Sequence, residues 1–565
     1  MQRSPNKVAH SAAVCTLAFV LGCGGSTDGK TPVTTQPPVT PTTPTAPAGP
    51  TAITVTTSRD SLVLDAWADT ASLAATVRDQ AGGLVSSATT VWASLDTAVV
   101  TVGPTGALVS VRPGVAKVRV TASLGSLTPA TKEVTVNVAR QRNVACIAPT
   151  VVARGAAAGV PAFGTSVNIL TGLPGAAWDG SRSFPADYDG DGDADLVRIE
   201  YSFPKSTPYG GTTRVFRNDG GTLSDATAQV LAGNVVPDHA RDFEIRDFTG
   251  DRVPDIYVAQ HGFDAAPFPG AANLLFTRSG TQLVERAAAA FSPYSRTSFS
   301  HAAASADVDC DGDLDLVELN LNANAPNYLF LNNGSGTFST APVSAFPIGV
   351  LGQSTAQRWQ EAEFIDFDSD GDADLFLGAR SGTNWNEDVM MVNDGFGRFR
   401  VTSSVKLPAP RFTPEHGVNN VKSADFNGDG RLDLLLFEIP KPFTTTSAIR
   451  LWLNAGNGQF QDASAAWGLP ATCGAEMIEP LFVVDFNKDG LPDVALPPGC
   501  PELGNGGILF NQGSAFASFK YSSIQPWLEF GAVTPLDIDS DGDPDLVFSD
   551  NRGKGNPPVL VRNPR

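Results

Sequence analysis

The sequence contains few charged residues: Asp, Glu, Lys and Arg make up 17% of its 565 residues. It also lacks long helix-period apolar runs, whereas glycine (55) and proline (42) are abundant, and this balance favours a turn-rich all-β protein. No apolar run reaches the roughly 20 residues that a membrane-spanning helix requires. Basic residues are outnumbered, and the net charge of −20 argues against nucleic acid as a partner, because phosphates require a basic surface.

Local motifs of several enzyme classes are also missing. The sequence has no His-Glu-x-x-His, no Gly-x-Ser-x-Gly, no phosphate-binding glycine-rich loop and no Cys-x-x-Cys. A catalytic site assembled from distant loops would leave no such motif. The absence therefore weakens the case for an enzyme without closing it.

Residues 1–22 have the pattern of an export signal. Arg3 and Lys7 precede a short apolar run from Ala12 to Leu21. The run ends at Val20-Leu21-Gly22-Cys23, which resembles a bacterial lipobox and implies cleavage before Cys23 and lipidation of its sulfur. An ordinary secretory signal with a chance cysteine is the alternative. In the sorting pattern of such lipoproteins Gly24 suggests the outer membrane or cell surface of a Gram-negative bacterium, with the lipid as the only membrane anchor.

Residues 23–50 are predicted to be a tether. From residue 31 to residue 50 the chain is rich in Thr and Pro and carries no charge, so it cannot bury enough apolar surface to fold. Polyproline-like geometry, at about 3.1 Å per residue, would hold the following domains some tens of Å from the membrane.

Residues 51–140 are predicted to form a small β-sandwich. Short alternating or apolar runs such as 98–102 and 115–120 are separated by Gly or Pro turns. The pattern from Trp92 to residue 122 resembles a bacterial immunoglobulin-like domain of group 2, which implies a spacer role. We expect Trp92 to be a core residue. Residues 141–162 would connect this domain to the rest.

An internal repeat dominates residues 163–565. One nonapeptide begins at Asp187, Asp247, Asp307, Asp366, Asp425, Asp485 and Asp537, at intervals of 60, 60, 59, 59, 60 and 52 residues. The fullest copies carry Asp at positions 1, 3, 5, 7 and 9 and Gly at position 6. We refer to the seven copies as loops one to seven, in chain order.

The spacing of these residues suits a hard cation. Oxygens at positions 1, 3 and 5 can converge only if the chain turns sharply, and Gly at position 6 permits the left-handed backbone that such a turn needs. Asp at position 9 completes the cage, while position 7 contributes its backbone carbonyl. Because all of these ligands are oxygens, the pattern predicts calcium before magnesium or a transition metal.

The candidate ligands follow the same positions in every loop. In the four fullest loops they are Asp187, Asp189, Asp191, Asp193 and Asp195; Asp307, Asp309, Asp311, Asp313 and Asp315; Asp366, Asp368, Asp370, Asp372 and Asp374; and Asp537, Asp539, Asp541, Asp543 and Asp545. In the other three they are Asp247, Asp251 and Asp255; Asp425, Asn427, Asp429, Arg431 and Asp433; and Asp485, Asn487, Asp489, Leu491 and Asp493.

An EF-hand is excluded by the residues that follow each loop. That motif requires a bidentate Glu at position 12 and then a helix, but position 12 is Glu only once, at Glu318. A short β-rich run such as 196–199 follows instead, so each loop is expected to join two strands.

The loop and the strands around it resemble the FG-GAP or VCBS repeats of integrin-like propellers. Later in each unit comes a third strand that ends in a Gly/Asn turn, as at Leu451-Trp452-Leu453-Asn454, and a fourth strand follows. The resemblance implies an all-β fold: a seven-bladed β-propeller over residues 163–565, preceded by the small immunoglobulin-like β-sandwich. It also implies calcium between the first two strands of each blade, up to seven ions in all.

Charge supports this interpretation. The seven nonapeptides contain 29 of the 59 acidic residues, and seven Ca²⁺ ions, each carrying two charges, would change the net charge from −20 to −6. Loop two has Thr249 at position 3 and Arg252 at position 6, so we expect it to bind calcium most weakly.

The two ends of the repeat region are expected to meet. The last unit stops after a third strand, near residue 563, whereas residues 163–174 resemble a fourth strand. The early segment should therefore complete the last blade and leave no open sheet edge.

Four cysteines follow Cys23, and an oxidising compartment favours disulfides. The sequence allows three pairings of Cys146, Cys310, Cys473 and Cys500. We favour Cys473 with Cys500, which flank the first two strands of one repeat. Cys146 and Cys310 then remain for each other, unless Cys310 is a free thiol within its loop.

A candidate ligand face lies opposite the loops. Residues six to ten positions before each first Asp, and residues just after the second strand, bring aromatic, carboxylate and imidazole groups that suit sugars or peptides. Packing and capping roles are the alternative for each residue. Three histidines come from adjacent repeats, so a transition-metal or acid–base site is a further hypothesis. The set is Trp178, Asp179, His239, His261, Asp264, His301, Trp359, Glu361, His416 and Trp527.

Two function classes follow from these patterns. We expect a calcium-stabilised, lipid-anchored surface binding or adhesion protein, monomeric, that recognises an extracellular glycan or protein. The alternative is an enzyme that degrades an extracellular polysaccharide or peptide. A pair of carboxylates with perturbed pKa values beside the propeller axis would favour the enzyme.

Overall fold

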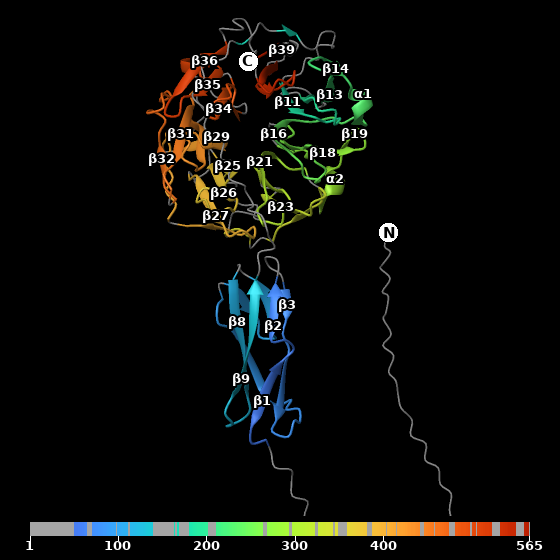
Figure 1. The fold of residues 1–565 in the computed structure, drawn as a ribbon, viewed down its shortest axis with the longest axis vertical. Coiled ribbons are helices and arrows are strands. Elements are labelled where there is room, and N and C mark those ends of the chain that lie inside the picture. Colours follow the sequence, from blue (N-terminus) through green and yellow to red (C-terminus); the bar gives the residue numbers. More distant parts are fainter. Residues whose placement is uncertain are drawn as a thin grey trace, which may run out of the picture.

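The computed structural model describes residues 50–64, 70–97, 99–110, 114–138, 163, 167–168, 180–201, 211–263, 268–292, 297–321, 326–342, 345–347, 359–380, 387–402, 404–413, 415–440, 446–456, 458–473, 481–497, 500–503, 506–521, 532–549 and 559–563. The export signal, Cys23, nearly all of the tether and the connector with Cys146 lie outside these residues. Strands and turns make up almost all of the described chain, which confirms the all-β prediction (Figure 1). None of its helices is long and apolar enough to cross a membrane.

The first unit consists of nine strands around one apolar core. Its sheets have the strand orders β2-β9-β8-β5, β3-β7-β6 and β1-β4. Alternate residues of β9 are buried, as one-sided packing requires, and Trp92 lies in the shared core as predicted. The strands are β1 (Ile53–Thr57), β2 (Ser61–Leu64), β3 (Thr70–Ser72), β4 (Ala75–Asp79), β5 (Thr89–Ser94), β6 (Val100–Val102), β7 (Ala107–Ser110), β8 (Gly114–Ser123) and β9 (Ala130–Val138).

Seven further sheets follow along the chain, each built mainly from four antiparallel strands. The first three contain β11 (Gly180–Ala186), β12 (Asp195–Tyr201), β13 (Thr212–Asn218) and β14 (Leu223–Asp225); β16 (Ala240–Arg246), β17 (Asp255–Gln260), β18 (Leu274–Ser279) and β19 (Gln282–Glu285); and β21 (Ser300–Ala306), β22 (Asp315–Asn320), β23 (Tyr328–Asn332) and β24 (Phe338–Thr340).

The remaining four sheets repeat this order. They contain β25 (Trp359–Ile365), β26 (Asp374–Ala379), β27 (Val389–Asn393) and β28 (Phe399–Val401); β29 (His416–Ala424), β30 (Asp433–Pro440), β31 (Ala448–Asn454) and β32 (Phe460–Asp462); β33 (Phe482–Val484), β34 (Asp493–Leu496), β35 (Gly507–Asn511) and β36 (Phe516–Lys520); and β37 (Ala532–Leu536), β38 (Asp545–Ser549), β39 (Val559–Val561) and β10 (Val167–Asn168).

Short elements link some neighbouring sheets. Helix α1 (Thr227–Val230) leads into β15 (Leu231–Ala232), which pairs in parallel with β19 of the following sheet. Helix α2 (Ala287–Ala290) and β20 (Phe291–Ser292) do the same one sheet later, where β20 pairs with β24. A 3-10 helix, η2 (Pro501–Leu503), precedes β35. The chain therefore adds a fifth strand to two sheets as it passes between them.

The seven sheets form a propeller-like ring (Figure 1). The first strands contact in succession, β16 with β21, β21 with β25, β25 with β29, β29 with β33, β33 with β37 and β37 with β11. Phe184 of β11 meets Phe243 of β16, with ring centroids 4.6 Å apart, so the series of contacts returns to its start. In the last sheet Val167 pairs with Leu560, which confirms that the early segment supplies the edge strand.

The ring is held by apolar layers between sheets. All six residues of β26 are buried, and its alternation sends Leu375 and Leu377 into one core cluster and Phe376 into the next. The first cluster includes β21 and β22, and the second includes β29 and β30. A strand packed on both faces needs a continuous apolar run, which is the run seen after each loop. Full burial of a side chain such as Phe376 contributes roughly 1.5–3 kcal/mol.

A hydrogen-bond relay joins each sheet to the loop of its neighbour. The third strand of six sheets ends in a buried Asn whose backbone N–H donates to the position-9 Asp of its own sheet, at 2.6–2.9 Å. The Asn side-chain amide donates to the position-2 carbonyl of the preceding loop, at 2.7–2.9 Å. These residues are Asn218, Asn332, Asn393, Asn454, Asn511 and Asn563.

The remaining sheet, which contains β16 to β19 and loop two, uses a different residue to reach the preceding loop. Its third strand has no Asn at this place, and Arg278 instead donates from Nη2 to the backbone carbonyl of Asp189 in loop one, at 2.8 Å. The contact between these two neighbours is thus kept with a longer side chain.

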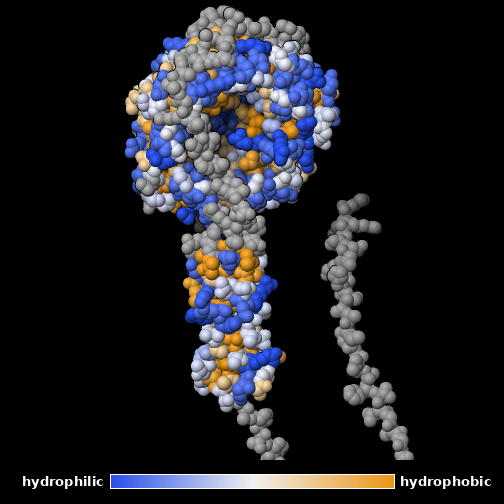
Figure 2. Space-filling model, viewed as in Figure 1, coloured by the Kyte–Doolittle hydropathy of each residue, from blue (hydrophilic) through white to orange (hydrophobic). Residues whose placement is uncertain are grey.

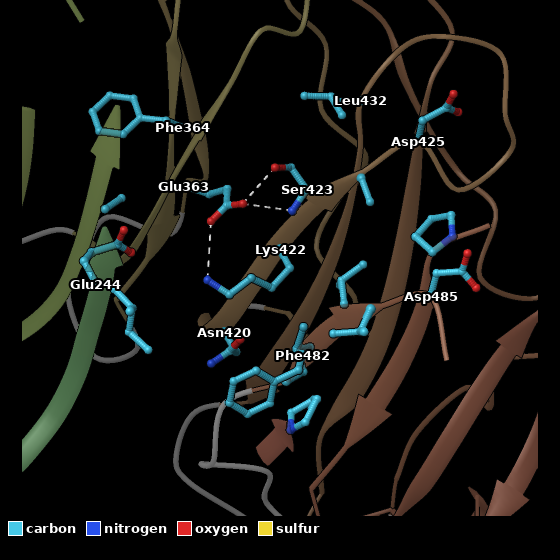
Figure 3. A pocket seen from close by; sticks show the side chains of 18 of the residues that line it. Glu244, Glu363, Phe364, Asn420, Lys422, Ser423, Asp425, Leu432, Phe482 and Asp485 are labelled. Atoms are coloured by element: carbon cyan, nitrogen blue, oxygen red, sulfur yellow. Dashed lines mark hydrogen bonds and ion pairs between the residues drawn. The ribbon is translucent and has the colours of Figure 1, made fainter. Parts of the chain in front are cut away.

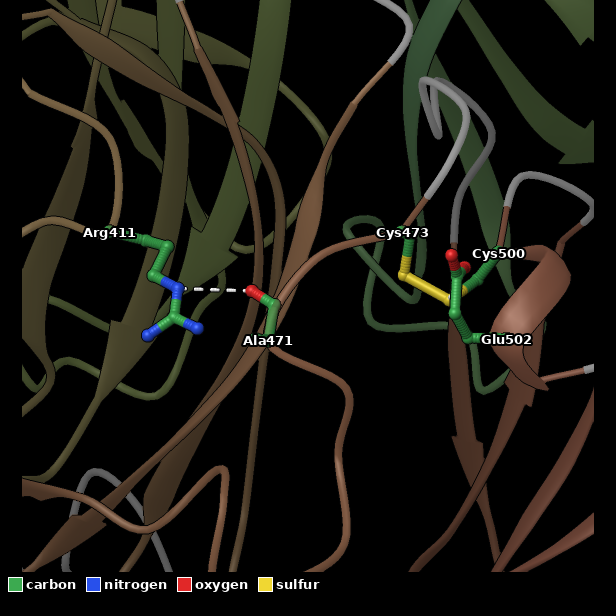
Figure 4. Close-up of a disulfide and its surroundings, with 5 residues drawn as sticks. All are labelled: Arg411, Ala471, Cys473, Cys500 and Glu502. Carbon is green, nitrogen blue, oxygen red and sulfur yellow. Dashed lines mark hydrogen bonds between the residues drawn. A yellow bond between two sulfur atoms is a disulfide. The ribbon is translucent and has the colours of Figure 1, made fainter.

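One disulfide closes a segment of the sixth sheet. Cys473 and Cys500 are bonded and are 27 residues apart, and this is the pairing that the sequence favoured (Figure 4). Cys473 also exchanges backbone hydrogen bonds with Ser447, so the disulfide ties the entry of the sheet to the one before it. Closing a loop of this size contributes about 3–4 kcal/mol in the chain-entropy account. Cys310 is disulfide-bonded as well, which overturns the free-thiol alternative.

We predict that Asn332→Ala lowers the unfolding free energy by about 1–3 kcal/mol, because the carbonyls of Phe248 and Leu314 lose their donor while buried. An exposed residue of β24 provides a control: Ser339→Ala should change it by less than about 0.5 kcal/mol. Urea unfolding of the full chain in calcium measures both. Equal effects of the two substitutions would contradict the role of the relay.

Candidate functional site

Each nonapeptide forms the turn between the first and second strands of a sheet, as the sequence predicted. In all seven loops the position-6 N–H donates to Oδ2 of the position-1 Asp, at 2.7–3.1 Å. Position 6 has a positive φ throughout, between 71° and 102°. Glycine fits this conformation in six loops, and Arg252 adopts it in loop two at φ 71°. The sharp turn inferred from glycine is therefore present even where glycine is not.

Position 4 has a second left-handed residue that the sequence did not reveal. Its φ lies between 55° and 84° in all seven loops. Three loops have Gly there, but the others have Cys310, Ser369, Lys488 and Ser540. Because these residue types share no property, the left-handed conformation at position 4 cannot be predicted from the sequence. The backbone thus turns twice within one nonapeptide.

Four loops bring three carboxylates together. In each of them, one oxygen from each of three Asp residues lies within 4.8 Å of the other two. These are the four loops with Asp at every odd position, and the groups are Asp187, Asp189 and Asp195; Asp307, Asp309 and Asp311; Asp366, Asp368 and Asp374; and Asp537, Asp539 and Asp541. In loops two, five and six, position 3 is Thr249, Asn427 or Asn487, each of which offers a neutral oxygen.

Several of these oxygens lack any protein partner. Oδ1 of Asp309, Asp537 and Asp539 is buried and accepts no hydrogen bond. Burial, followed by the charges of Asp311 and Asp307, raises the pKa of Asp309 to about 7. A buried carboxylate oxygen without a donor is costly, and a bound cation would remove that cost. The residues present therefore fit a hard divalent ion.

The position-9 Asp residues are structural as well as acidic. Each is buried, and its Oδ2 accepts the N–H of position 2, at 2.8–3.3 Å. Burial raises the pKa of every one of these carboxyl groups, more than the amide donors lower it. The pKa is about 6 for Asp195, about 7 for Asp255, Asp433 and Asp545, about 8 for Asp493 and about 9 for Asp374, and it is raised well above the ordinary value for Asp315.

The opposite ends of the first strands carry the proposed ligand face. Of the ten residues expected there, Trp178, Asp179, Asp264 and Trp527 lie outside the described residues. His239 precedes β16, His301 lies at the start of β21 and His261 follows β17. Ring centroids are 5.1 Å apart for His239 and His261, and 5.0 Å apart for His261 and His301. The structure thus gathers the three histidines that the sequence grouped.

These histidines are neutral at physiological pH. Burial lowers the pKa of His239 to about 3, and it lowers the pKa of His261 and His301 well below the ordinary value. His301 accepts a hydrogen bond from Arg241 Nε at 3.3 Å, and its Nδ1 lies 2.7 Å from the carbonyl of Gln360. Three nitrogens of this described cluster do not come within 4.8 Å of one another. The arrangement does not favour a metal, because His301 is engaged and a guanidinium lies beside it.

His261 differs from its neighbours. It is 4% exposed, yet neither ring nitrogen has a hydrogen-bond partner. Its ring stacks on Phe299 with centroids 4.1 Å apart, and Phe299 in turn meets the exposed Phe268 edge-on at 5.5 Å. Phe268 was missed by the sequence analysis, since a Phe between two prolines of a loop gives no periodic signal. An exposed aromatic ring beside an unsatisfied imidazole is suited to a ligand.

Trp359 and His416 have structural roles instead. Trp359 belongs to the core cluster between two sheets, and its Nε1 donates to the carbonyl of Glu387 at 3.3 Å. His416 lies 3.1 Å from Asp388 through Nε2; burial lowers its pKa, but this hydrogen bond and the charges of Asp388 and Glu438 together raise it. Neither side chain offers an open surface.

Glu361 lies within the ring, where the sequence analysis missed four charged neighbours. Asp242 and Glu244 of β16, Glu363 of β25 and Lys422 of β29 line the same central cavity as Glu361. A signal existed: polar residues occupy the fifth and third positions before the first Asp of loops two, four and five. These positions share one face of a strand, and that face looks onto the axis.

The repeats themselves match a known description. Residues 187–258, 307–377 and 366–436 match the FG-GAP-like repeat, and each match begins at the first Asp of a loop. The chain contains FG-GAP-like repeats. Because the matched segments start where the loops start, the FG-GAP-like unit and the loop-and-strand unit seen in the structure coincide.

Two curated proteins are similar to part of the chain. Human cartilage acidic protein 1 is 29% identical over 192 residues, which are 31% of this chain and 24% of that protein. The mouse protein is 27% identical over 225 residues, covering 37% of this chain and 30% of that protein. The chain therefore spans less than a third of the length of the curated relatives it matches.

Among solved structures, the Photorhabdus luminescens Tc holotoxin pore aligns with 66% of this chain and 17% of its own. The sequence identity is 16% and the TM-score is 0.29.

We predict that in a chelator the melting temperature falls as the pH rises from about 6.5 to about 8.5. The position-9 carboxyl groups have raised pKa values, so the folded state binds more protons than the unfolded state in this window and loses stability as they ionise. The buried histidines do not oppose this trend, because above about pH 6.5 they are mostly neutral in both states. Saturating calcium should remove the slope. Scanning fluorimetry measures it, and a flat or rising curve in chelator would contradict the assignment.

Proposed function

We propose that this chain is a calcium-stabilised surface binding protein of the adhesion type. Its ring is a seven-bladed β-propeller with a calcium ion in each loop, and its ligand is an extracellular glycan or protein. The first unit is an immunoglobulin-like spacer. A lipid on Cys23 anchors the chain to the outer membrane or cell surface of a Gram-negative bacterium.

The loops supply the main support for calcium. Carboxylates converge in four loops, and one buried oxygen of each of Asp309, Asp537 and Asp539 has no hydrogen-bond partner. When bound, calcium would neutralise these charges. The protein's own part is to aim the oxygens, by the two left-handed residues and the buried position-9 Asp.

The observation that carries the binding function is the exposed ring of Phe268, which packs edge-on against buried Phe299, which in turn stacks on the unsatisfied His261. This aromatic group lies at the ends of the strands that are remote from the loops. A ligand that binds there would therefore not contact the loops. FG-GAP-like repeats and the partial similarity to cartilage acidic protein 1 support an adhesion-like repeat protein.

The test is a binding screen of the full chain against a glycan array, sister cells and host-cell surfaces, in calcium and in chelator. We expect Phe268→Ala and His261→Ala to weaken binding by about tenfold or more while the melting temperature in calcium is nearly unchanged for Phe268→Ala. Val401→Ala, at an exposed apolar residue on outer strand β28, is the control. Undiminished binding by both variants would place the site elsewhere.

One observation favours the second candidate, an enzyme that cleaves an extracellular polymer. Burial raises the pKa of Glu244 to about 7 and that of Glu361 well above the ordinary value, and both line the central cavity. A carboxyl group whose pKa is raised toward neutral pH is suited to act as a general acid, with a second carboxyl group as its partner. Release of reducing ends or peptide fragments by the purified chain, lost in Glu244→Gln, would establish this function.

A further inference from the structure

A cavity of about 910 Å³ occupies the middle of the ring. Residues from β11, β16, β21, β25, β29, β33 and β37 all line it, so every sheet contributes its first strand. Asp425 and Asp485, the first residues of loops five and six, also line it and place it at the loop end of the axis (Figure 3). Figure 2 shows the centre of the ring as a hollow between the sheets. We call this cavity the axial chamber.

The axial chamber gathers charges from three strands. β16 contributes Asp242 and Glu244, β25 contributes Glu361 and Glu363, and β29 contributes Lys422. Lys422 points toward Glu363, with Nζ 3.6 Å from Oε2 (Figure 3). The other oxygen of Glu363 accepts hydrogen bonds from the backbone N–H and hydroxyl of Ser423, at 2.9 and 2.8 Å. Both carboxylate oxygens of Glu363 therefore have partners, and the charge of Lys422 is paired with Glu363.

The remaining three carboxylates, Asp242, Glu244 and Glu361, have only one further described cation within ion-pair distance, Arg246 beside Glu244. Asp242 accepts a backbone N–H from Ala303 at 2.8 Å, and Glu244 accepts the hydroxyl of Ser305. Arg246 lies 3.9 Å from Glu244, but its side chain is 55% exposed at the rim. Arg241 directs hydrogen bonds to His301 and to Asn419, toward the other end of the axis.

Glu361 is the least satisfied of the group. It is 7% exposed, it lines the axial chamber, and no described residue donates a hydrogen bond to its carboxylate or forms an ion pair with it. Burial and then the charge of Asp242 raise its pKa well above the ordinary value, against the weaker opposing charges of Lys422 and Arg241. An isolated buried carboxylate of this kind is destabilising unless a cation or donor reaches it.

The geometry suits an organic cation better than a metal ion. These four carboxylates do not bring three oxygens within 4.8 Å of one another, unlike those of the loops. The chamber is also far larger than one ion and is partly apolar, with Phe364 and Phe482 in its wall (Figure 3). Carboxylates beside aromatic rings suit ammonium and guanidinium groups.

We propose that the axial chamber binds the ammonium or guanidinium group of an organic cation, with Glu361 and Glu244 as its counter-charges and the phenyl rings of the wall beside it. The source is a free polyamine or a basic side chain of a partner protein. This site is distinct from the ligand face formed by His261 and Phe268, and the two can be tested separately.

The experiment is isothermal titration of the full chain, saturated with calcium so that the loops do not compete for the cation. The probes are spermidine, a short Gly-Arg-Gly peptide and its Gly-Ala-Gly counterpart. The variants are Glu361→Gln and Glu244→Gln, which keep shape and remove charge. Glu502→Gln, at an exposed residue beside the disulfide, is the matched control.

We expect spermidine or the arginine peptide to bind, the alanine peptide not to bind, and each chamber variant to weaken binding by about tenfold or more while the control does not. Binding of spermidine alone identifies a polyamine, and binding of the peptide alone identifies a basic side chain. Glu361→Gln should also keep or raise the melting temperature, because it removes an uncompensated charge.

Three results would overturn the proposal. The first is that neither cation binds the wild-type chain, and the second is that binding survives in both chamber variants. The third is that Glu361→Gln unfolds the protein, which would make Glu361 structural. Polymer cleavage that depends on Glu244 without any cation binding would instead assign the axial chamber to the enzyme candidate.

Discussion

Each sheet of the ring depends on one buried carboxylate, the Asp at position 9 of its loop. Its Oδ2 accepts the N–H of position 2 and holds the loop, while in six of the seven sheets its Oδ1 accepts the N–H of the third-strand Asn. That Asn reaches the carbonyl of the preceding loop. Loop, sheet and neighbouring sheet are thus joined through two side chains, the Asp carboxylate and the Asn amide. The same interaction repeats around the ring, and Arg278 replaces it where the Asn is missing.

This arrangement creates an electrostatic problem that a cation would solve. The relay requires the position-9 carboxylate to be buried, and burial alone raises its pKa into or near the physiological range. The remaining loop carboxylates add repulsion, as at Asp309. Calcium would favour the ionised form of this carboxyl group, which accepts the backbone N–H groups. The structural role of the loop and its proposed metal-binding role therefore depend on the same carboxylates, which would explain why polar residues recur where a turn alone would suffice.

Much of this architecture could be predicted from the sequence because it repeats. The interval between first Asp residues located the loops, the buried second strands followed from apolar runs such as 375–377, and the resemblance of residues 163–174 to a fourth strand anticipated the β10–β39 pairing. The Cys473–Cys500 bond followed from its place around one hairpin. Each of these depends on local spacing, which a single sequence preserves.

Features that depend on side-chain environment were not predictable in the same way. The left-handed residue at position 4 has no common residue type, and Phe268 lies in a loop without a periodic pattern. Trp359 and His416 were assigned to the ligand face from their sequence positions. In the structure Trp359 packs in the core and His416 contacts Asp388. The carboxylates of the axial chamber alternate along their strands, as residues on one face of any strand do. Only the ring arrangement of the sheets shows that these strand faces point toward the same axis.

The most direct test of the account is an anomalous difference map from crystals of the calcium-loaded full chain. We predict one peak inside each of loops one, three, four and seven, surrounded by the Asp oxygens at positions 1, 3, 5 and 9, with the weakest peak of the seven in loop two. Ordered loops one, three, four and seven without a peak would contradict the claim that calcium is what these carboxylates were arranged to hold.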